Sequence, residues 1–298
     1  MWPRAAILHS AIVIYVICVS FAAILIRLAD APPLTIASYR LSIAALVMLS
    51  WAAWSRIRSS RVSTKQVSGG SSLNKRDIAL ILFSSVCLAL HFAFWTASLD
   101  YTSVANSVVL VTTTPFMVAL ASRVLFGEPI YLYAMLGISV GIIGGLVLAA
   151  GDAGKPGQLM GDMLAFLGAV SVVGYLMAGR RLRRRISAST YNVWVYSGTA
   201  LILVIAASLS GAPFTGFTQD TYVALLLLAL VPQLIGHSLL NWSLAYATAT
   251  VVAISVTAEP VIATLLAIPV LGEWPSQTSV AGGLLILMGI YLAVRPRT

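Results

Sequence analysis

The chain has 298 residues, of which 59% are hydrophobic and only 9% are charged. Soluble domains average roughly 45–50% apolar and about 25% charged residues, so this composition excludes a water-soluble protein. At about 20 residues per membrane crossing, the length accommodates roughly ten transmembrane helices and no separate soluble domain. The net charge of +9 would suggest nucleic-acid binding in a soluble protein, but here it is interpreted by position relative to the membrane.

Hydropathy predicts an all-α polytopic membrane protein with ten spans, five in residues 1–150 and five in residues 151–298. The spans expected in the first half are Ile7–Leu28, Leu34–Trp54, Ile78–Ser98, Ser103–Ser122 and Tyr131–Ala150. Those expected in the second half are Leu159–Gly179, Thr190–Ser210, Thr221–Leu244, Thr248–Leu271 and Ser276–Val294. The first apolar run is too long for the core of a secretory signal, so we expect it to remain as the first helix.

Basic residues cluster in alternate loops of this predicted topology, chiefly in the segments 56–76 and 180–185. Lys and Arg are enriched in cytoplasmic loops of membrane proteins, which predicts cytoplasmic N- and C-termini. Topology explains these loops better than lipid or nucleic-acid recognition does, so no nucleic-acid partner is expected. Cys18 and Cys87 both lie in apolar runs and predict no disulfide framework.

The two halves match each other at an offset of 145 residues without gaps. A biased apolar composition explains matched Leu and Val, but not matched Pro, Tyr and Gly-Glu, so a duplication is predicted. Because each half holds an odd number of spans, the second copy is expected to be inverted in the membrane. Inverted repeats recur in secondary transporters, where two similar halves alternate around one central site. The informative pairs are Tyr101 with Tyr246, Pro115 with Pro260, and Gly127-Glu128 with Gly272-Glu273.

The matched Gly-Glu pairs are expected at helix boundaries. In Gly127-Glu128-Pro129 the glycine can end a helix, the proline can begin the next, and the carboxylate lies where the helix dipole favours it. Glu273 with Pro275 repeats this arrangement, and a gate carboxylate on each face is the alternative. Glycines at close spacing in the fifth and tenth spans predict close helix packing: Gly137, Gly141, Gly145, Gly282 and Gly289.

Pro115 and Pro260 lie about twelve residues into the fourth and ninth spans. A proline removes an amide and its ring displaces a backbone carbonyl, which lipid cannot satisfy. Each helix is therefore expected to break there and to face protein or water, which predicts a central site between the two helices. A kink that serves packing alone is the alternative.

Three ionisable residues are predicted deep within the spans. Glu259 precedes Pro260, and a buried carboxylate is costly unless it is protonated, paired or hydrated. It is therefore either a proton carrier or a protonated group hydrogen-bonded around the proline break. His91 and His237 occupy nearly equivalent repeat positions and either line a polar path or have a structural role. No metal-binding motif accompanies them, so neither a metal nor a cofactor is predicted.

Arg40 is predicted near the outer end of the second span, where snorkelling to the interface explains it and coordination of a carboxylate is the alternative. Arg27 and Asp30 are expected to form an interfacial pair. Among aromatic residues, Trp95, Tyr175 and Trp242 are the better cavity candidates, because the others are expected to anchor span ends. Uncharged polar groups suit either helix contacts or ligand contacts: Asn106, Thr113, Thr114, Gln233, Asn241 and Thr257.

Taken in order, several segments resemble the EamA family of the drug/metabolite transporter superfamily. The resemblance rests on the five-plus-five spans, on Ala97–Tyr101, on Pro115 to Gly127-Glu128, and on Ala258-Glu259-Pro260 to Gly272-Glu273. It implies a bacterial inner-membrane exporter of small metabolites, often amino acids, that works by alternating access. Within the family, the aromatic residues make the chain most similar to YddG-type aromatic amino-acid exporters.

We therefore expect a secondary transporter that exports amino acids or related metabolites through a central cavity, with a small-molecule substrate and membrane lipid as its partners. Glu259 is compatible with proton antiport, and facilitated diffusion is equally compatible with the sequence. An intramembrane enzyme using His91 or His237 lacks a recognisable nucleophile and base, and a passive channel is the third possibility. The expected cavity residues are His91, Trp95, Asn106, Thr114, Tyr175, His237, Trp242 and Glu259, beside the breaks at Pro115 and Pro260.

Overall fold

The computed structural model of the protein describes residues 2–61, 73–127, 132–152, 157–247 and 249–294. Within these ranges all regular secondary structure is helical, as predicted. The first half contains α1 Trp2–Ser20, α2 Ala22–Leu28, α3 Pro33–Arg61, α4 Lys75–Ser98, α5 Val104–Val111, α6 Thr114–Phe126 and α7 Leu132–Asp152. The second contains α8 Gln158–Leu182, α9 Ala188–Leu209, α10 Gln219–Leu228, η1 Ala229–His237, α11 Ser238–Ser243, α12 Ala249–Ser255, η2 Val256–Ala258, α13 Glu259–Leu271 and α14 Gln277–Val294.

Seven helical stretches of the described residues are long and apolar enough to cross a membrane. They are Ala6–Leu28, Pro33–Ser55, Lys75–Ser98, Val104–Leu125, Gln158–Leu182, Ala188–Leu209 and Gln219–Ser243. Three further apolar stretches are shorter, namely Met135–Val147, Glu259–Leu271 and Gln277–Leu292. The chain is therefore a multi-pass membrane protein, and the count of ten crossings stays a prediction.

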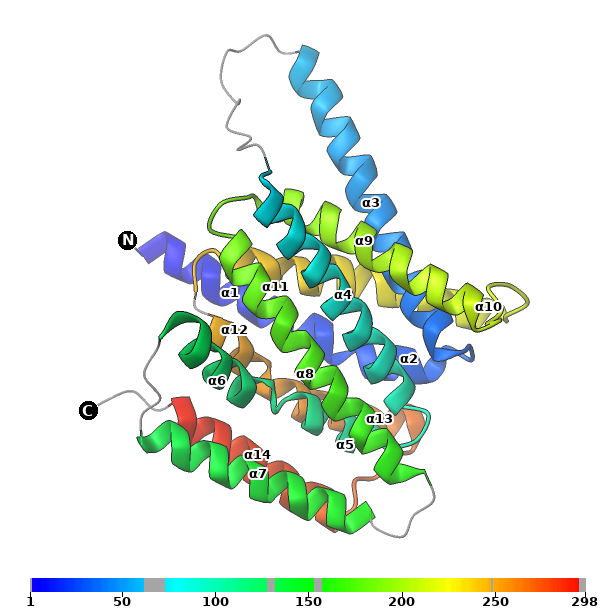
Figure 1. Ribbon diagram of the computed structural model, residues 1–298. Helices are drawn as coiled ribbons and strands as arrows, with labels where there is room; N and C mark the ends of the chain where they lie inside the picture. The colour runs from blue at the N-terminus through cyan, green and yellow to red at the C-terminus, as the bar shows by residue number, and fades with distance from the viewer. Residues whose placement is uncertain (1, 62–72, 128–131, 153–156, 248, 295–298) are drawn as a thin grey trace.

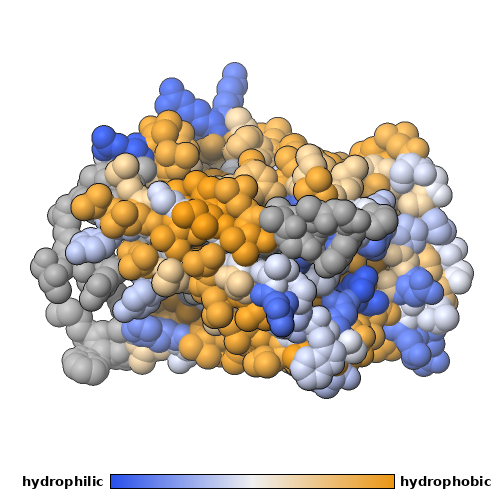
Figure 2. Space-filling model, turned by 90° about the horizontal axis from the view of Figure 1, so that it is seen from below, coloured by the Kyte–Doolittle hydropathy of each residue, from blue (hydrophilic) through white to orange (hydrophobic). Residues whose placement is uncertain are grey.

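Large apolar side chains cover much of the outer surface. Leu136 and Ile143 on α7, and Leu284 and Tyr291 on α14, are examples of exposed residues. Figure 2 shows one face of the molecule on which hydrophobic side chains predominate, with hydrophilic residues between them and toward one end. Soluble monomers rarely expose an apolar surface of this extent, whereas a lipid environment accepts it without cost.

Several of the closest helix pairs join the two halves of the chain. α7 packs along α14, α4 along α8, and α3 along α9 (Figure 1). At the first pair the backbones touch, because a Cβ atom on Gly144 would lie 2.7 Å from the carbonyl oxygen of Gly282. A Cβ on Gly289 would lie 2.5 Å from the carbonyl oxygen of Gly137. Close packing through glycine is thus confirmed for this pair, but Gly145, which was predicted to take part, faces open space.

Each half has a helix interruption at its central proline, Pro115 or Pro260. α5 ends at Val111, and α6 begins at Thr114 with Pro115 in its first turn. α12 is followed by the 3₁₀ turn η2, and α13 then begins at Glu259 with Pro260 in its first turn. Proline is tolerated there because the first-turn amides have no intrahelical partner.

The two interrupted helices pack against each other in opposite directions, so that the first part of each contacts the second part of the other. α5 packs against α13, and α6 packs against α12 (Figure 1). Both α6 and α13 end at a glycine in the left-handed conformation, with φ of 69° at Gly127 and 67° at Gly272. The arrangement brings the two interruptions to the middle of the bundle.

A further interruption lies in the eighth predicted span, which we expected to be one continuous helix. η1 is a π-helix that contains Pro232 and connects α10 to α11. The proline removes a backbone donor, and the wider turn accommodates its ring. η1 packs against α1 and α3, so the irregular turn is buried inside the bundle.

The predicted helix caps and the predicted Arg27–Asp30 pair differ from the structure or lie beyond its described residues. Glu128 and Pro129 lie outside the described residues, as does the side chain of Thr257. Glu273 does not cap its own helix, since α14 begins at Gln277 and the Glu273 Oε2 atom accepts a hydrogen bond from the Val104 amide of α5 at 3.0 Å. The predicted pair of Arg27 with Asp30 is wrong, because Arg27 instead forms an ion pair with Glu273.

Candidate functional site

A cavity lies where the two interrupted helices meet. Its volume is about 630 Å³ when the open solvent within it is counted. From the first interruption the wall includes Val111, Thr112, Thr114 and Pro115, and from the second it includes Val252, Ala253, Val256 and Glu259. Residues of α1, α2, α3, α4, α8 and the η1–α11 segment complete the wall.

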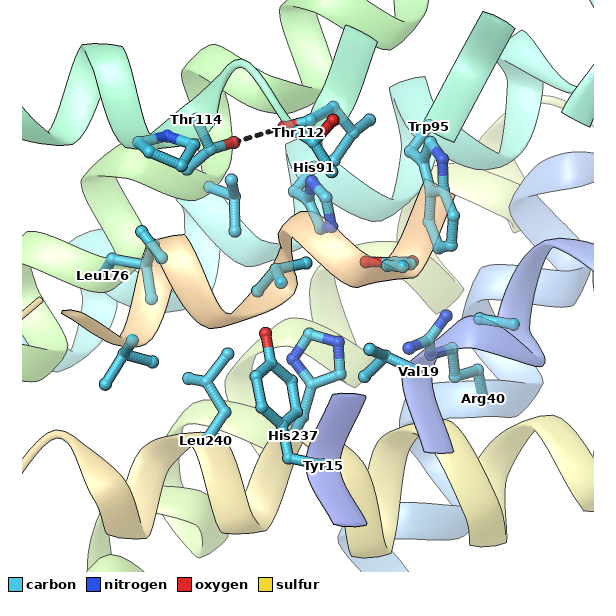
Figure 3. A pocket seen from close by; sticks show the side chains of 18 residues that line it. Tyr15, Val19, Arg40, His91, Trp95, Thr112, Thr114, Leu176, His237 and Leu240 are labelled. Atoms are coloured by element: carbon cyan, nitrogen blue, oxygen red, sulfur yellow. Dashed lines mark hydrogen bonds between the residues drawn. The ribbon is translucent and has the colours of Figure 1, made fainter. Parts of the chain in front are cut away.

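The chemistry of the wall differs between the ends of the cavity. In Figure 3 Arg40 and Trp95 lie toward one end, and Leu176 and Leu240 lie toward the other. The cavity thus combines a polar end, which can hold a charged group, with an aliphatic end, which can hold an apolar one.

Arg40 is the buried cation of this site, with only 1% of its surface exposed. Its Nε atom donates a hydrogen bond to Gln233 Oε1 at 2.9 Å, and its guanidinium carbon lies 4.1 Å from the centroid of the Phe92 ring. The predicted snorkelling is therefore wrong: the side chain points into the protein, because Gln233 and Phe92 offer the guanidinium a partner and a π face there.

The two terminal nitrogens of Arg40 have no such partner. Both Nη1 and Nη2 are buried and make no hydrogen bond within the part of the chain that the structure describes. No ion pair there joins Arg40 to a carboxylate. A buried charge without a partner is costly, so this guanidinium stands out among the charges of the structure.

Glu259 is the carboxylate in the cavity wall, with 6% of its surface exposed. It is the first residue of α13, where the dipole of the helix favours a negative charge. The cavity therefore carries one buried cation and one buried carboxylate on different helices.

The two histidines have different surroundings. His91 Nδ1 lies 3.0 Å from the Gly168 carbonyl oxygen, and its ring stacks on Trp95 at 5.8 Å between centroids. That geometry suits a proton on Nδ1 and holds the ring against α8. His237 packs edge-on against Phe92 at 5.5 Å, and its buried Nδ1 makes no hydrogen bond among the described residues. His237 is therefore the one with unused hydrogen-bonding capacity.

Three consecutive threonine hydroxyls satisfy the backbone at the first interruption. Thr112, Thr113 and Thr114 donate to the carbonyl oxygens of Val109, Leu110 and Val111 at 2.7, 2.7 and 2.6 Å respectively (Figure 3 for Thr114). Short side-chain hydrogen bonds of this kind replace the helical ones that a proline break removes inside a membrane. The hydroxyl of Thr114 is thus engaged with the backbone, although the residue lines the cavity.

The structure gathers some of the predicted site residues and separates others. His91, Trp95, Thr114, Pro115, His237 and Glu259 line the cavity. Asn106, Tyr175, Trp242 and Pro260 are not among the residues that line it.

The separated residues have other contacts. The Tyr175 hydroxyl donates to Asn241 Oδ1 at 2.6 Å, and Asn241 Nδ2 donates to Asn192 Oδ1 at 2.7 Å. Trp242 packs on Tyr246 at 4.5 Å between ring centroids. The Tyr175–Asn241–Asn192 contacts tie α8, α9 and α11 together, which accounts for these polar groups without a ligand.

Sequence reasoning missed Tyr15 and Thr112 as members of the site, and it gave Arg40 a ligand-binding role only as the alternative to snorkelling. An arginine inside an apolar span was the available signal for Arg40, since intramembrane charges mark functional sites by default. No group of three or more His, Cys, Asp or Glu residues that could hold a metal ion occurs within the described ranges.

Known proteins share both the sequence pattern and the fold. The model of the EamA-like transporter family matches two segments, residues 7–150 and 159–295. A protein of Archaeoglobus fulgidus named as an uncharacterized transporter is 26% identical over 279 residues, covering 92% of this chain and 91% of its own. The uncharacterized transporter YdfC of Bacillus subtilis is 25% identical over 208 residues, or 67% of each chain. A solved crystal structure superposes with a TM-score of 0.69 at 20% identity, covering 99% of this chain and 98% of the other, which shows a common fold.

Proposed function

The chain belongs to the EamA-like transporter family. We propose that it is a secondary transporter of small zwitterionic metabolites, namely amino acids, including aromatic ones. Transport would proceed outward by alternating access through the cavity between α5–α6 and α12–α13. The YddG-type aromatic exporters are the proposed functional analogues.

The proposed architecture is two inverted five-helix halves, residues 1–150 and 151–298, that cross the membrane ten times. Two separate family matches in one chain support a duplication. The head-to-tail packing of the two interrupted helices supports opposite orientations of the halves. In such a carrier, rocking of one half against the other exposes a fixed site to each side in turn.

The observation that carries this proposal is that Arg40 and Glu259 both line one cavity that also has an aliphatic end. A zwitterion with an apolar side chain complements all three features, since its carboxylate, ammonium and side chain each find a matching surface. Intramembrane charges are expensive and are retained mainly where they contact substrates, ions or protons.

Glu259 is also the proposed proton carrier. A carboxylate at the site can exchange a proton for a substrate ammonium, which would couple export to proton entry. Facilitated diffusion is the alternative if Glu259 stays in one protonation state throughout the cycle.

The proposed location is a bacterial inner membrane with both chain ends in the cytoplasm. Arg180, Arg183, Arg184 and Arg185 gather around the α8–α9 connection, and an arginine cluster of this kind is typical of a cytoplasmic loop.

Counterflow in liposomes tests the proposal. Purified protein is reconstituted with unlabelled leucine, phenylalanine or tryptophan inside, and uptake of the same labelled amino acid is followed. A carrier gives saturable, transient accumulation of label. Flux that never saturates would indicate a pore, chemical alteration of the solute would indicate an enzyme, and no uptake of any amino acid would contradict the proposed substrate class.

A further inference from the structure

We propose that Arg40 is the anchor for the substrate's carboxylate, with the indole N–H of Trp95 as a neighbouring donor, so that transport requires a free carboxylate. This inference rests on the proposed function and names the chemical group that the site selects.

The guanidinium has two terminal donor nitrogens, Nη1 and Nη2, and its orientation is fixed by its other contacts. Gln233 holds Nε at 2.9 Å, and the Phe92 ring lies 4.1 Å from the guanidinium carbon. Nη1 and Nη2 remain without a partner among the described residues. The planar fork of an arginine matches the two oxygens of a carboxylate, and an immobilised fork loses little entropy on binding.

Other unused hydrogen-bonding atoms lie beside this fork. Trp95, whose ring centroid is 5.9 Å from the guanidinium carbon of Arg40, has a buried Nε1 that makes no hydrogen bond to the residues that the structure describes. His237 contacts the same Phe92 ring as Arg40, and its Nδ1 is likewise unsatisfied among the described residues. Buried polar atoms are nearly always hydrogen-bonded, so this group of unsatisfied nitrogens indicates a missing polar partner.

The missing partner is better matched by a carboxylate than by a phosphate. Arg40 is the one Lys or Arg among the residues that line the cavity, and Glu259 lines it too. A phosphate dianion would be incompletely neutralised by one guanidinium and repelled by Glu259. A carboxylate needs one guanidinium, and an ammonium on the same molecule turns Glu259 from a repulsive group into an attractive one.

The unsatisfied nitrogens are shielded from water in this structure. Binding of a carboxylate would give these buried nitrogens hydrogen-bond partners once the surrounding side chains adjust, which favours binding.

Competition with the wild-type protein tests this inference without any mutation. Counterflow of labelled phenylalanine is measured against unlabelled phenylalanine, which carries both the carboxylate and the ammonium, and against phenylalaninamide and phenethylamine, which keep the ammonium but lack the carboxylate. Leucine with leucinamide forms a second pair. We expect the amino acid to compete at least about tenfold better than the amide and the amine, the equivalent of one lost charged contact. Equal competition by the amide would overturn the anchor.

Variants provide the second arm. Arg40→Gln is expected to raise the half-saturating phenylalanine concentration at least about tenfold, and Arg40→Lys is expected to recover only part of it, because a lysine lacks the fork. The matched control is Arg58→Gln, which removes an exposed arginine that stacks on Trp54 at 5.4 Å and should leave transport unchanged.

The outcomes separate the two proposals. An unchanged half-saturation in Arg40→Gln, with wild-type transport intact, overturns the anchor and leaves the transport function standing. A wild-type protein that moves none of the amino acids overturns both. If Arg40→Gln does not fold, as judged by its thermal unfolding, the wild-type competition decides alone.

Discussion

Arg27, in the last turn of α2, forms an ion pair with Glu273 in the connection between α13 and α14, although 246 positions separate them in the chain. Arg27 Nη1 also donates to the Leu99 carbonyl oxygen at 2.8 Å, and Glu273 Oε2 accepts from the Val104 amide at 3.0 Å. One ion pair thus joins α2, the α4–α5 connection and the α13–α14 connection, and links the two halves of the chain.

Removing either charge of this pair should destabilise the protein. We expect Arg27→Gln and Glu273→Gln each to lower the free energy of unfolding by about 1 kcal/mol, because the pair is only partly buried and carries backbone hydrogen bonds as well. Thermal unfolding in detergent of both single variants and the double variant provides the measurement. Since the residues interact directly, the double variant should lose less stability than the two single variants lose together. A loss in the double variant equal to the sum of the single losses would show that the ion pair contributes nothing.

The α7–α14 contact should not tolerate a side chain at Gly289. Gly289→Ala places a methyl group 2.5 Å from the Gly137 carbonyl oxygen, so the helices must separate, at an expected cost of about 1–3 kcal/mol. Gly145→Ala is the matched control in the same helix pair, because its Cβ would enter open space and alanine favours a helix. Equal unfolding temperatures for the two variants would disprove the close contact.

The threonine hydroxyls at the first interruption should be needed for its stability. Thr114→Val keeps the shape of the side chain but leaves the Val111 carbonyl oxygen without its 2.6 Å hydrogen bond. We expect a loss of about 1 kcal/mol, measured by thermal unfolding, and a lower transport rate. Thr114→Ser retains the hydroxyl and should restore both properties; a serine variant as impaired as the valine variant would point to packing instead.

Glu259 should govern the pH dependence of transport if it carries the proton. Glu259→Gln keeps the shape of the side chain but cannot titrate, so net export should lose its dependence on pH. Exchange of internal for external substrate should continue, because exchange needs no net proton movement. A variant whose net transport keeps the wild-type pH profile would remove Glu259 from coupling.

The all-helical fold class and the helix breaks at the prolines could be predicted from the sequence, because both depend on local chemistry. An apolar run forces a helix in lipid, and a proline at position 115 or 260 cannot be accommodated in the middle of one. Which side chains point into the cavity was harder to predict. Tyr175 and Trp242 were expected in the cavity from their aromatic character, but which side of a helix faces the centre depends on its packing partners.

Arg40 shows the same limit. Its distance from the predicted membrane surface suggested snorkelling, but its partner Gln233 lies 193 positions away on a π-helix that hydropathy does not reveal. The wider turn around Pro232 belongs to the same segment as Gln233 and His237. Without that segment the sequence left snorkelling and coordination of a carboxylate as two alternatives for Arg40.

The central claim is that the cavity between the interrupted helices is reached from each side of the membrane in turn. Thr112→Cys, in a background where the free, buried Cys18 and Cys87 are replaced by serine, places a thiol on the cavity wall. A membrane-impermeant thiol reagent is applied to vesicles of either orientation, with and without phenylalanine. We predict labelling from both sides, slowed by phenylalanine in each case. Labelling from only one side or from neither, or labelling that is unaffected by any amino acid that the protein transports, would contradict alternating access to this cavity.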